Sequence, residues 1–351
     1  MVGWAIVQKH IGQKVNKVDF SSSPLIEGLQ IESLSAIKIT DKEGQTTTLN
    51  RQNGAFVVAE KGNYPADITK INDLINNCLD IRTNEKVTDN PDNYADLGLT
   101  DKTAHCHIAF LDSDGNEVVG LFLSERGEKG GAFARLLSGK GAYSIQSLPW
   151  IKIAPMDYIN SEPFGIDNKQ ITSVTVNTGN DSYVLKTSDD KSTVELQDMP
   201  EGKQYKETVY KTVFGALTSF RFEDVVNVAN APESLSFDST YTCRLDDKTV
   251  YKLSLAKKDD KVYAKISADY LDKSQVQISQ DDSKEQLKEK ESKLLAMDAV
   301  KAFNQKHQNW IYEVPSYQAG NLNKSLSELV EDIPKSESET ESDAAKTETV
   351  G

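Results

Sequence analysis

Hydrophobic residues in the stretch Tyr64–Leu79 recur at spacings of three and four, with polar residues between them. The apolar positions are Ile68, Ile71, Leu74, Ile75 and Cys78. This period places them on one face of a helix and the polar residues on the other. Pro65 suits the first turn, and Asp67 puts a carboxylate at the positive end of the helix. The pattern predicts an amphipathic helix that needs a sheet or another helix opposite its apolar face.

A weaker copy of this stretch lies about 140 residues later, in Gln204–Asn230. The same helical stripe is repeated there by Val209, Val213, Leu217 and Phe220. We therefore expect a second helix from about Glu201 to Ser219, related to the first by internal duplication.

Short alternating stretches surround both helices and predict strands. Around the first helix they are Leu34–Thr40, Thr46–Asn50, Ala55–Ala59, His105–Leu111, Val118–Leu123, Ala132–Leu137 and Tyr143–Ile145. The pair Asn53-Gly54 is a strong hairpin signal. Around the second helix the stretches are Ile171–Val176, Ser182–Thr187, Ser192–Leu196, Thr240–Leu245, Val250–Leu255 and Val262–Ile266. Cys106 and Cys243 are expected at corresponding strand positions of the two copies.

The order of strands, helix and strands predicts an α+β fold with two similar antiparallel sheet-plus-helix units in tandem. We expect a leader over residues 1–32, a first repeat over 33–168 and a second repeat over 169–280. A C-terminal helix-strand-helix segment follows over 281–332, and a disordered acidic tail over 333–351. The alternative is two unrelated sheets that share a common pattern.

Composition narrows the class of protein. The net charge of −14 and the pI near 4.9 argue against a nucleic-acid partner, which needs basic patches. The cysteines Cys78, Cys106 and Cys243 form no C-x-x-C pair and are expected to be small buried residues. The apolar run Val2–Val7, followed by lysines, is either the end of a truncated membrane anchor or an ordinary leader or first strand.

Candidate chemistry is sparse. His105 and His107 are two residues apart on a predicted strand and are weak metal candidates without a third ligand. Their alternative role is as two surface histidines beside a buried cysteine. The segment Asp112–Asn116 has the wrong spacing for a calcium loop, and the glycine-lysine loops after Glu125 lack a phosphate-binding spacing. We assign no catalytic residue, no metal and no cofactor.

The aromatic residues Trp310, Tyr312 and Tyr317 are the candidate interaction surface. They are able to line a carbohydrate-type groove, but aromatic residues on one strand face more often pack in a core or an interface.

Three pieces of sequence carry a family resemblance: the segment Tyr64–Val87, the segment Asn90–Leu99 with its Tyr-Ala-Asp-Leu-Gly-Leu motif, and the segment Trp310–Asp332. Over roughly Leu34 to Asp332 the chain resembles the bacterial domain-of-unknown-function 4340 family. The resemblance implies one N-terminal membrane helix, a duplicated body outside the cytoplasm, and an auxiliary role in ABC-type transport systems associated with gliding motility. This chain departs from that pattern in lacking a full membrane helix, and the family supplies no catalytic residues to carry over.

The resemblance, together with the lack of a catalytic constellation, implies a non-enzymatic, membrane-anchored accessory protein of an ABC-type transport system, on the periplasmic side of the bacterial inner membrane. Its expected partners are transporter subunits or other envelope proteins, bound through protein–protein contacts. One alternative is a ligand-binding module that uses a cleft between the two repeats, and a second is a hydrolase of unknown class.

Overall fold

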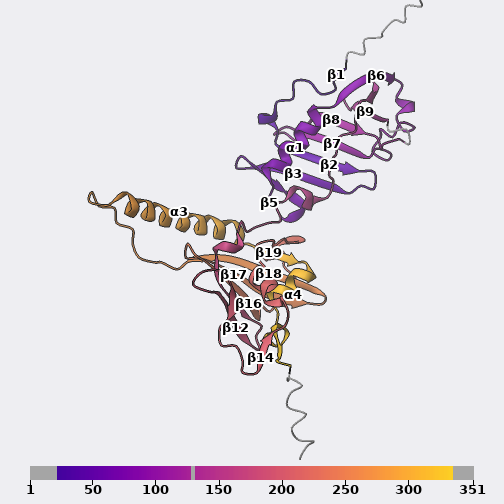
Figure 1. The fold of residues 1–351 in the computed structure, drawn as a ribbon. Helices are drawn as coiled ribbons and strands as arrows, with labels where there is room; N and C mark the ends of the chain where they lie inside the picture. The colour runs from indigo at the N-terminus through magenta and orange to yellow at the C-terminus, as the bar shows by residue number, and fades with distance from the viewer. Residues whose placement is uncertain (1–21, 128–130, 335–351) are drawn as a thin grey trace, which may run out of the picture. The chain divides into compact units, whose positions relative to one another are not determined.

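A computed structural model describes residues 22–127 and 131–334 of the chain. The membrane-anchor interpretation of Val2–Val7 and nearly all of the acidic tail lie outside these residues. The chain forms two compact units that divide after Tyr158, whereas the sequence pattern placed the division after residue 168. Figure 1 shows a sheet and helices in each unit. No described helix is both long and apolar enough to cross a membrane.

The first unit is built on a ten-stranded antiparallel sheet with the order β1-β6-β10-β9-β8-β7-β2-β3-β4-β5. Its one α-helix among the described residues is α1 (Ile68–Leu79). The strands are β1 (Ser23–Pro24), β2 (Ala36–Asp41), β3 (Thr46–Gln52), β4 (Ala55–Val58), β5 (Tyr64–Pro65), β6 (Arg82–Thr88), β7 (Cys106–Leu111), β8 (Glu117–Leu123), β9 (Ala132–Leu136) and β10 (Ala142–Ile145).

The second unit is built on an eight-stranded sheet with the order β13-β12-β11-β16-β17-β18-β19-β15, next to a small β14-β20 pair. Its helices are α2 (Val209–Phe214), α3 (Lys284–His307), α4 (Ser316–Leu322) and α5 (Leu326–Leu329). The strands are β11 (Ile171–Asn177), β12 (Ser182–Thr187), β13 (Val194–Leu196), β14 (Lys203–Tyr205), β15 (Asp224–Asn227), β16 (Ser239–Leu245), β17 (Thr249–Lys258), β18 (Lys261–Tyr270), β19 (Trp310–Val314) and β20 (Val330–Asp332).

The two sheets share one strand order. If β2 is matched with β11 and each later strand with its counterpart, the order β4-β3-β2-β7-β8-β9-β10-β6 becomes β13-β12-β11-β16-β17-β18-β19-β15. Every neighbouring pair is antiparallel in both sheets. The prediction of two similar antiparallel units is therefore confirmed. The strand β19, which the pattern assigned to a separate C-terminal segment, belongs to the second sheet.

The match extends to individual rows of paired residues. One row of the first sheet runs through Thr47, Ile39, Ile108, Leu121 and Leu136. Its counterpart in the second sheet runs through Tyr183, Val176, Tyr241, Leu253 and Ile266. The next row contains His107, Phe122 and Arg135, and its counterpart contains Thr240, Ser254 and Lys265. In this register the position of Cys106 in the first sheet is equivalent to that of Ser239 in the second sheet. The expected equivalence of Cys106 and Cys243 is therefore wrong.

The first helix forms as its pattern predicts. The side chain of Asp67 caps it by accepting a hydrogen bond from the Thr69 N–H at 2.9 Å. The apolar stripe is buried against the sheet, except that Ile68 in the first turn is 61% exposed. The hairpin signal is also confirmed, since Asn53 and Gly54 both have positive φ, as a type I′ turn requires.

The second helix is much shorter than expected. Residues 203–205 form β14 and pair with β20, so they do not enter the helix. Glu207 has a φ of +49°, a left-handed conformation that excludes a continuous α-helix from Glu201. The remaining turns bury Val213, Phe214 and Leu217, and the fully buried Tyr241 donates its hydroxyl to the Val213 carbonyl at 2.7 Å.

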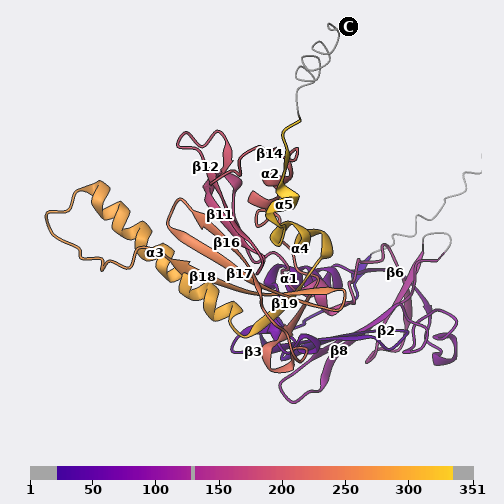
Figure 2. The same cartoon turned by 90° about the horizontal axis from the view of Figure 1, so that it is seen from below.

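The largest difference between the units is an insertion. Five residues join β9 to β10, whereas α3 and its flanking segments separate β18 from β19. The C-terminal part of α3 packs Phe303 and His307 beside Tyr251 and Tyr312, while its N-terminal part is exposed. Figure 2 shows this helix crossing β17 and β18 and continuing past them.

Candidate functional site

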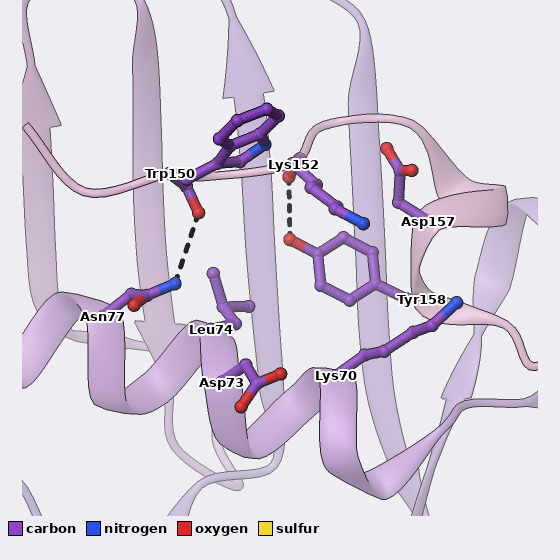
Figure 3. Close-up of a pocket in the computed structure, with 8 residues that line it drawn as sticks. All are labelled: Lys70, Asp73, Leu74, Asn77, Trp150, Lys152, Asp157 and Tyr158. Carbon is purple, nitrogen blue, oxygen red and sulfur yellow. Dashed lines mark hydrogen bonds between the residues drawn. The ribbon is translucent and has the colours of Figure 1, made fainter.

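One face of α1 forms a wall of a pocket in the first unit. Lys70, Asp73, Leu74 and Asn77 follow the helical spacing of three and four and therefore line up on this face. The opposite wall is the segment that follows the last strand of the sheet, with Trp150, Lys152, Asp157 and Tyr158 (Figure 3). The pocket has a volume of about 180 Å³. Its lining contains two lysines and two aspartates, so the formal charges of the lining cancel.

The segment opposite α1 is fixed to the unit at several points. Asn77 donates its side-chain amide to the carbonyl of Trp150 at 3.3 Å, and the Tyr158 hydroxyl donates to the carbonyl of Lys152 at 2.7 Å (Figure 3). The side chain of Ile151 is buried, and the Asp67 N–H donates to the carbonyl of Tyr158. The backbone on both sides of Trp150 is thus held in place.

The indole of Trp150 is 81% exposed, although its backbone is fixed. Removing a large aromatic side chain from water releases hydrophobic free energy, and an exposed side chain releases it only when a partner covers it. Aromatic anchors surrounded by polar residues are also the usual centres of protein–protein interfaces. The arrangement therefore suits binding of another surface.

Several buried titratable groups of the two units are held in their neutral forms. Burial raises the pKa of Tyr158 well above its usual range, so its hydroxyl remains a hydrogen-bond donor. Burial also raises the pKa of the Cys78 thiol, and that of Cys106 and Cys243 to about 12. All three thiols are free and buried, as expected from the sequence, and thiols with raised pKa values are poor nucleophiles.

The two histidine candidates lie at the start of β7, where His107 contacts an aromatic ring and a carboxylate. His107 stacks on Phe122 at 4.1 Å between ring centroids, and its Nε2 lies 3.1 Å from Oε1 of Glu117. His105 precedes the first residue of β7 and is half-buried. Within residues 22–127 and 131–334, no three histidine, cysteine or acidic residues lie close enough to hold a metal ion.

The aromatic candidates separate into two groups. Trp310 is 8% exposed and Tyr312 is fully buried, because β19 lies between β18 and β15 and turns these side chains into the core. The Tyr312 hydroxyl lies 2.5 Å from Nδ1 of His307. These two residues therefore cannot form an exposed interaction surface. Tyr317 is 69% exposed and remains a surface residue.

The sequence reasoning did not select Trp150. The available signal was the dipeptide Pro149-Trp150 itself, which begins four residues after the last predicted strand of the first repeat. Tyr317 occupies the similar position after the last large strand of the second sheet. Among the described residues, each unit thus presents one exposed aromatic residue shortly after that strand, Trp150 in a loop and Tyr317 in α4.

Fold and site together define an antiparallel α+β protein of two similar units, with an exposed tryptophan on a fixed backbone and three buried thiols. A family model described as a domain of unknown function (DUF4340) matches residues 57–240. The match covers just over half of the chain and includes parts of both units, so the chain belongs to the DUF4340 family. No curated protein and no solved structure is significantly similar to it.

Proposed function

We propose that this protein is a non-enzymatic accessory protein of an ABC-type transport system, anchored in the bacterial inner membrane with its body in the periplasm. Its role is to bind transporter subunits or other envelope proteins. The observation that carries the docking role is Trp150, which is 81% exposed on a backbone held by Asn77 and Tyr158. The transport context and the location rest on the family resemblance.

The surroundings of Trp150 favour docking over chemistry. Lys70, Asp73, Lys152 and Asp157 surround the pocket with both signs of charge, which matches the polar rim of a protein interface. A pocket of about 180 Å³ lies below the roughly 300 Å³ at which small-molecule sites usually begin. The pocket is therefore better suited to one side chain of a partner than to a free substrate.

The direct test is crosslinking and affinity purification of the tagged protein from the bacterial envelope. We expect recovery of an ABC permease subunit, reduced at least tenfold by Trp150→Ala. Leu137→Ala is the matched control, because Leu137 is a half-exposed apolar residue of the same unit outside the pocket. Equal recovery with Trp150→Ala, or recovery of soluble background alone, would contradict the proposal.

A second variant tests whether the fixed backbone matters. Tyr158→Phe removes the hydroxyl that donates to the Lys152 carbonyl but keeps the buried ring. We expect it to weaken partner binding less than Trp150→Ala, because the indole remains but is held less firmly. The ligand-binding and hydrolase alternatives stay predictions. Stabilisation of the protein by a sugar, lipid or peptide in a thermal-shift screen would favour the ligand-binding module.

A further inference from the structure

A separate pocket in the second unit is lined by cations. Its walls come from three segments: the short 3₁₀ turn Asn168–Gln170, the hairpin turn between β12 and β13, and α2. Each segment contributes one lysine, namely Lys169, Lys191 and Lys211. No carboxylate lines it, although the whole chain has a net charge of −14. Four other pockets of the described residues each contain at least two carboxylates.

The backbone that carries these lysines is anchored locally. Asp167 caps the turn by accepting a hydrogen bond from the Lys169 N–H at 2.9 Å. In the hairpin turn, the Lys191 N–H donates to the Ser188 carbonyl at 2.8 Å, and the Lys191 side chain pairs with Asp246 at 2.9 Å. The neighbouring Asp190 does not line the pocket, and its carboxylate accepts hydrogen bonds from within the turn.

Two of the three ammonium groups are available to a ligand. Within the described residues, neither Lys169 nor Lys211 has a carboxylate at ion-pair distance, and both side chains are exposed. The ammonium group of Lys211 lies 5.8 Å from the centre of the Tyr210 ring. The pocket has a volume of about 480 Å³, which is within the usual range of ligand sites.

We propose that this pocket binds a phosphate group carried by an organic molecule. Lysine recognises phosphate as a compact point charge. Lys169 and Lys211 bring to the pocket two ammonium groups without a carboxylate partner among the described residues, and Lys191, which pairs with Asp246, is the third lysine of its lining. The volume exceeds that of phosphate alone, and the half-buried Tyr210 and Val194 offer aromatic and apolar surface to the group that carries it. A phospholipid headgroup and a soluble phosphate compound share this chemistry.

The test uses the full chain at low ionic strength, because salt screens such contacts. Inorganic phosphate is titrated by NMR, and binding to vesicles of phosphatidylcholine with 30% phosphatidylglycerol is compared with binding to phosphatidylcholine alone. We expect saturable phosphate binding, with chemical-shift changes at Lys169, Lys191 and Lys211. Added binding to the phosphatidylglycerol vesicles would identify a lipid headgroup as the source, and its absence would identify a soluble compound.

A matched pair of double variants distinguishes phosphate binding at this pocket from attraction of phosphate to exposed lysines anywhere on the surface. Lys169→Ala with Lys211→Ala should lower phosphate affinity at least about tenfold, since it removes the two available charges. Lys186→Ala with Lys252→Ala removes the same charge from exposed positions outside the pocket and should change affinity less than about twofold. Equal losses in both double variants, or no saturable phosphate binding by the wild type, would overturn the proposal. Thermal unfolding of each variant verifies that it is folded. The outcome is independent of the proposed docking role of Trp150.

Discussion

The two units of this protein share their sheets and differ in the segments between strands. Equivalent rows of residues keep their register across five strands. In contrast, the two-residue turn Asn53-Gly54 corresponds to residues 188–193, and the short β9–β10 connection corresponds to the insertion that contains α3. The copied part of the module is the sheet, while the candidate binding features lie in segments that differ, as in many proteins whose loops carry function.

A pair of matched core substitutions tests the equivalence most strongly. Leu121 and Leu253 hold the same position in the two sheets, and both are fully buried. Leu121→Ala and Leu253→Ala should each lower the free energy of unfolding by roughly 2–5 kcal/mol, through lost burial and the cavity left behind. Hydrogen exchange measured by mass spectrometry should report each loss in the unit that carries it. A negligible cost at one of the two positions would break the comparison.

The next row sharpens the comparison, because equivalent cations have different surroundings. Arg135 is 9% exposed, lies over Phe122 at 4.0 Å from the ring centre, and donates Nε–H to the Leu99 carbonyl at 2.7 Å. Arg135→Leu should cost roughly 1–3 kcal/mol, because that carbonyl loses its partner.

The matched change is Lys265→Leu, since Lys265 is exposed and contacts only the Phe237 ring among the interactions described for it. This substitution should cost about 0.5 kcal/mol, the value of an exposed cation–π contact. Urea denaturation of both variants measures the difference. Equal costs would mean that burial does not distinguish the two positions.

The insertion predicts a pH dependence that is specific to the second unit. Burial lowers the pKa of His307 to about 3 from an ordinary value near 6.5, so the folded protein keeps this imidazole neutral. The unfolded chain binds the proton more readily, so the stability that this group contributes is complete above pH 6.5 and is lost as pH falls toward 3. The loss should be about 1.4 kcal/mol for each pH unit below 6.5.

Hydrogen exchange between pH 7 and pH 5 tests this expectation in the second unit. His307→Gln, which does not titrate, should flatten the dependence there, although it lowers stability at neutral pH by removing the contact with Tyr312. Tyr143, the counterpart of Tyr312, lies in a unit without this insertion and serves as the internal comparison. An unchanged pH profile in His307→Gln would contradict the assignment.

The exposed aromatic residues should show the smallest effect on stability. Trp150→Ala and Tyr317→Ala each remove a side chain that is at least 69% exposed. Each should change the free energy of unfolding by less than about 0.5 kcal/mol, as surface substitutions usually do. Thermal denaturation measures this. A larger loss for Trp150→Ala would mean that the indole stabilises its own unit and is not reserved for a partner.

The sequence predicted the parts of the fold in which local and global preferences agree. The stripe of α1, the Asn53-Gly54 hairpin and most strands follow directly from periodicity and turn chemistry. The length of α2 could not be predicted, because the pairing of β14 with β20 joins residues more than 100 positions apart and overrides the helical pattern. The place of β19 inside the second sheet was hidden for the same reason, since α3 separates it from β18 in sequence.

The candidate sites were harder to predict than the fold. Trp310 and Tyr312 have the composition of a binding surface, and only the position of β19 between two other strands shows that they are buried. Trp150 lies outside any periodic segment, so no sequence pattern predicts its exposure. The hydrogen bonds that hold the backbone around it are visible only in the structure. Lys169, Lys191 and Lys211 are far enough apart in sequence that no motif joins them, and the fold alone brings them to one pocket.

Site-specific photocrosslinking in living cells tests the docking role of the first unit most directly. A photoreactive phenylalanine analogue is placed at position 150 and, as the matched control in the second unit, at position 317. The account predicts that position 150 forms an adduct with an ABC permease subunit and that position 317 does not. Absence of an adduct at position 150, or equal adducts at both positions, would contradict it.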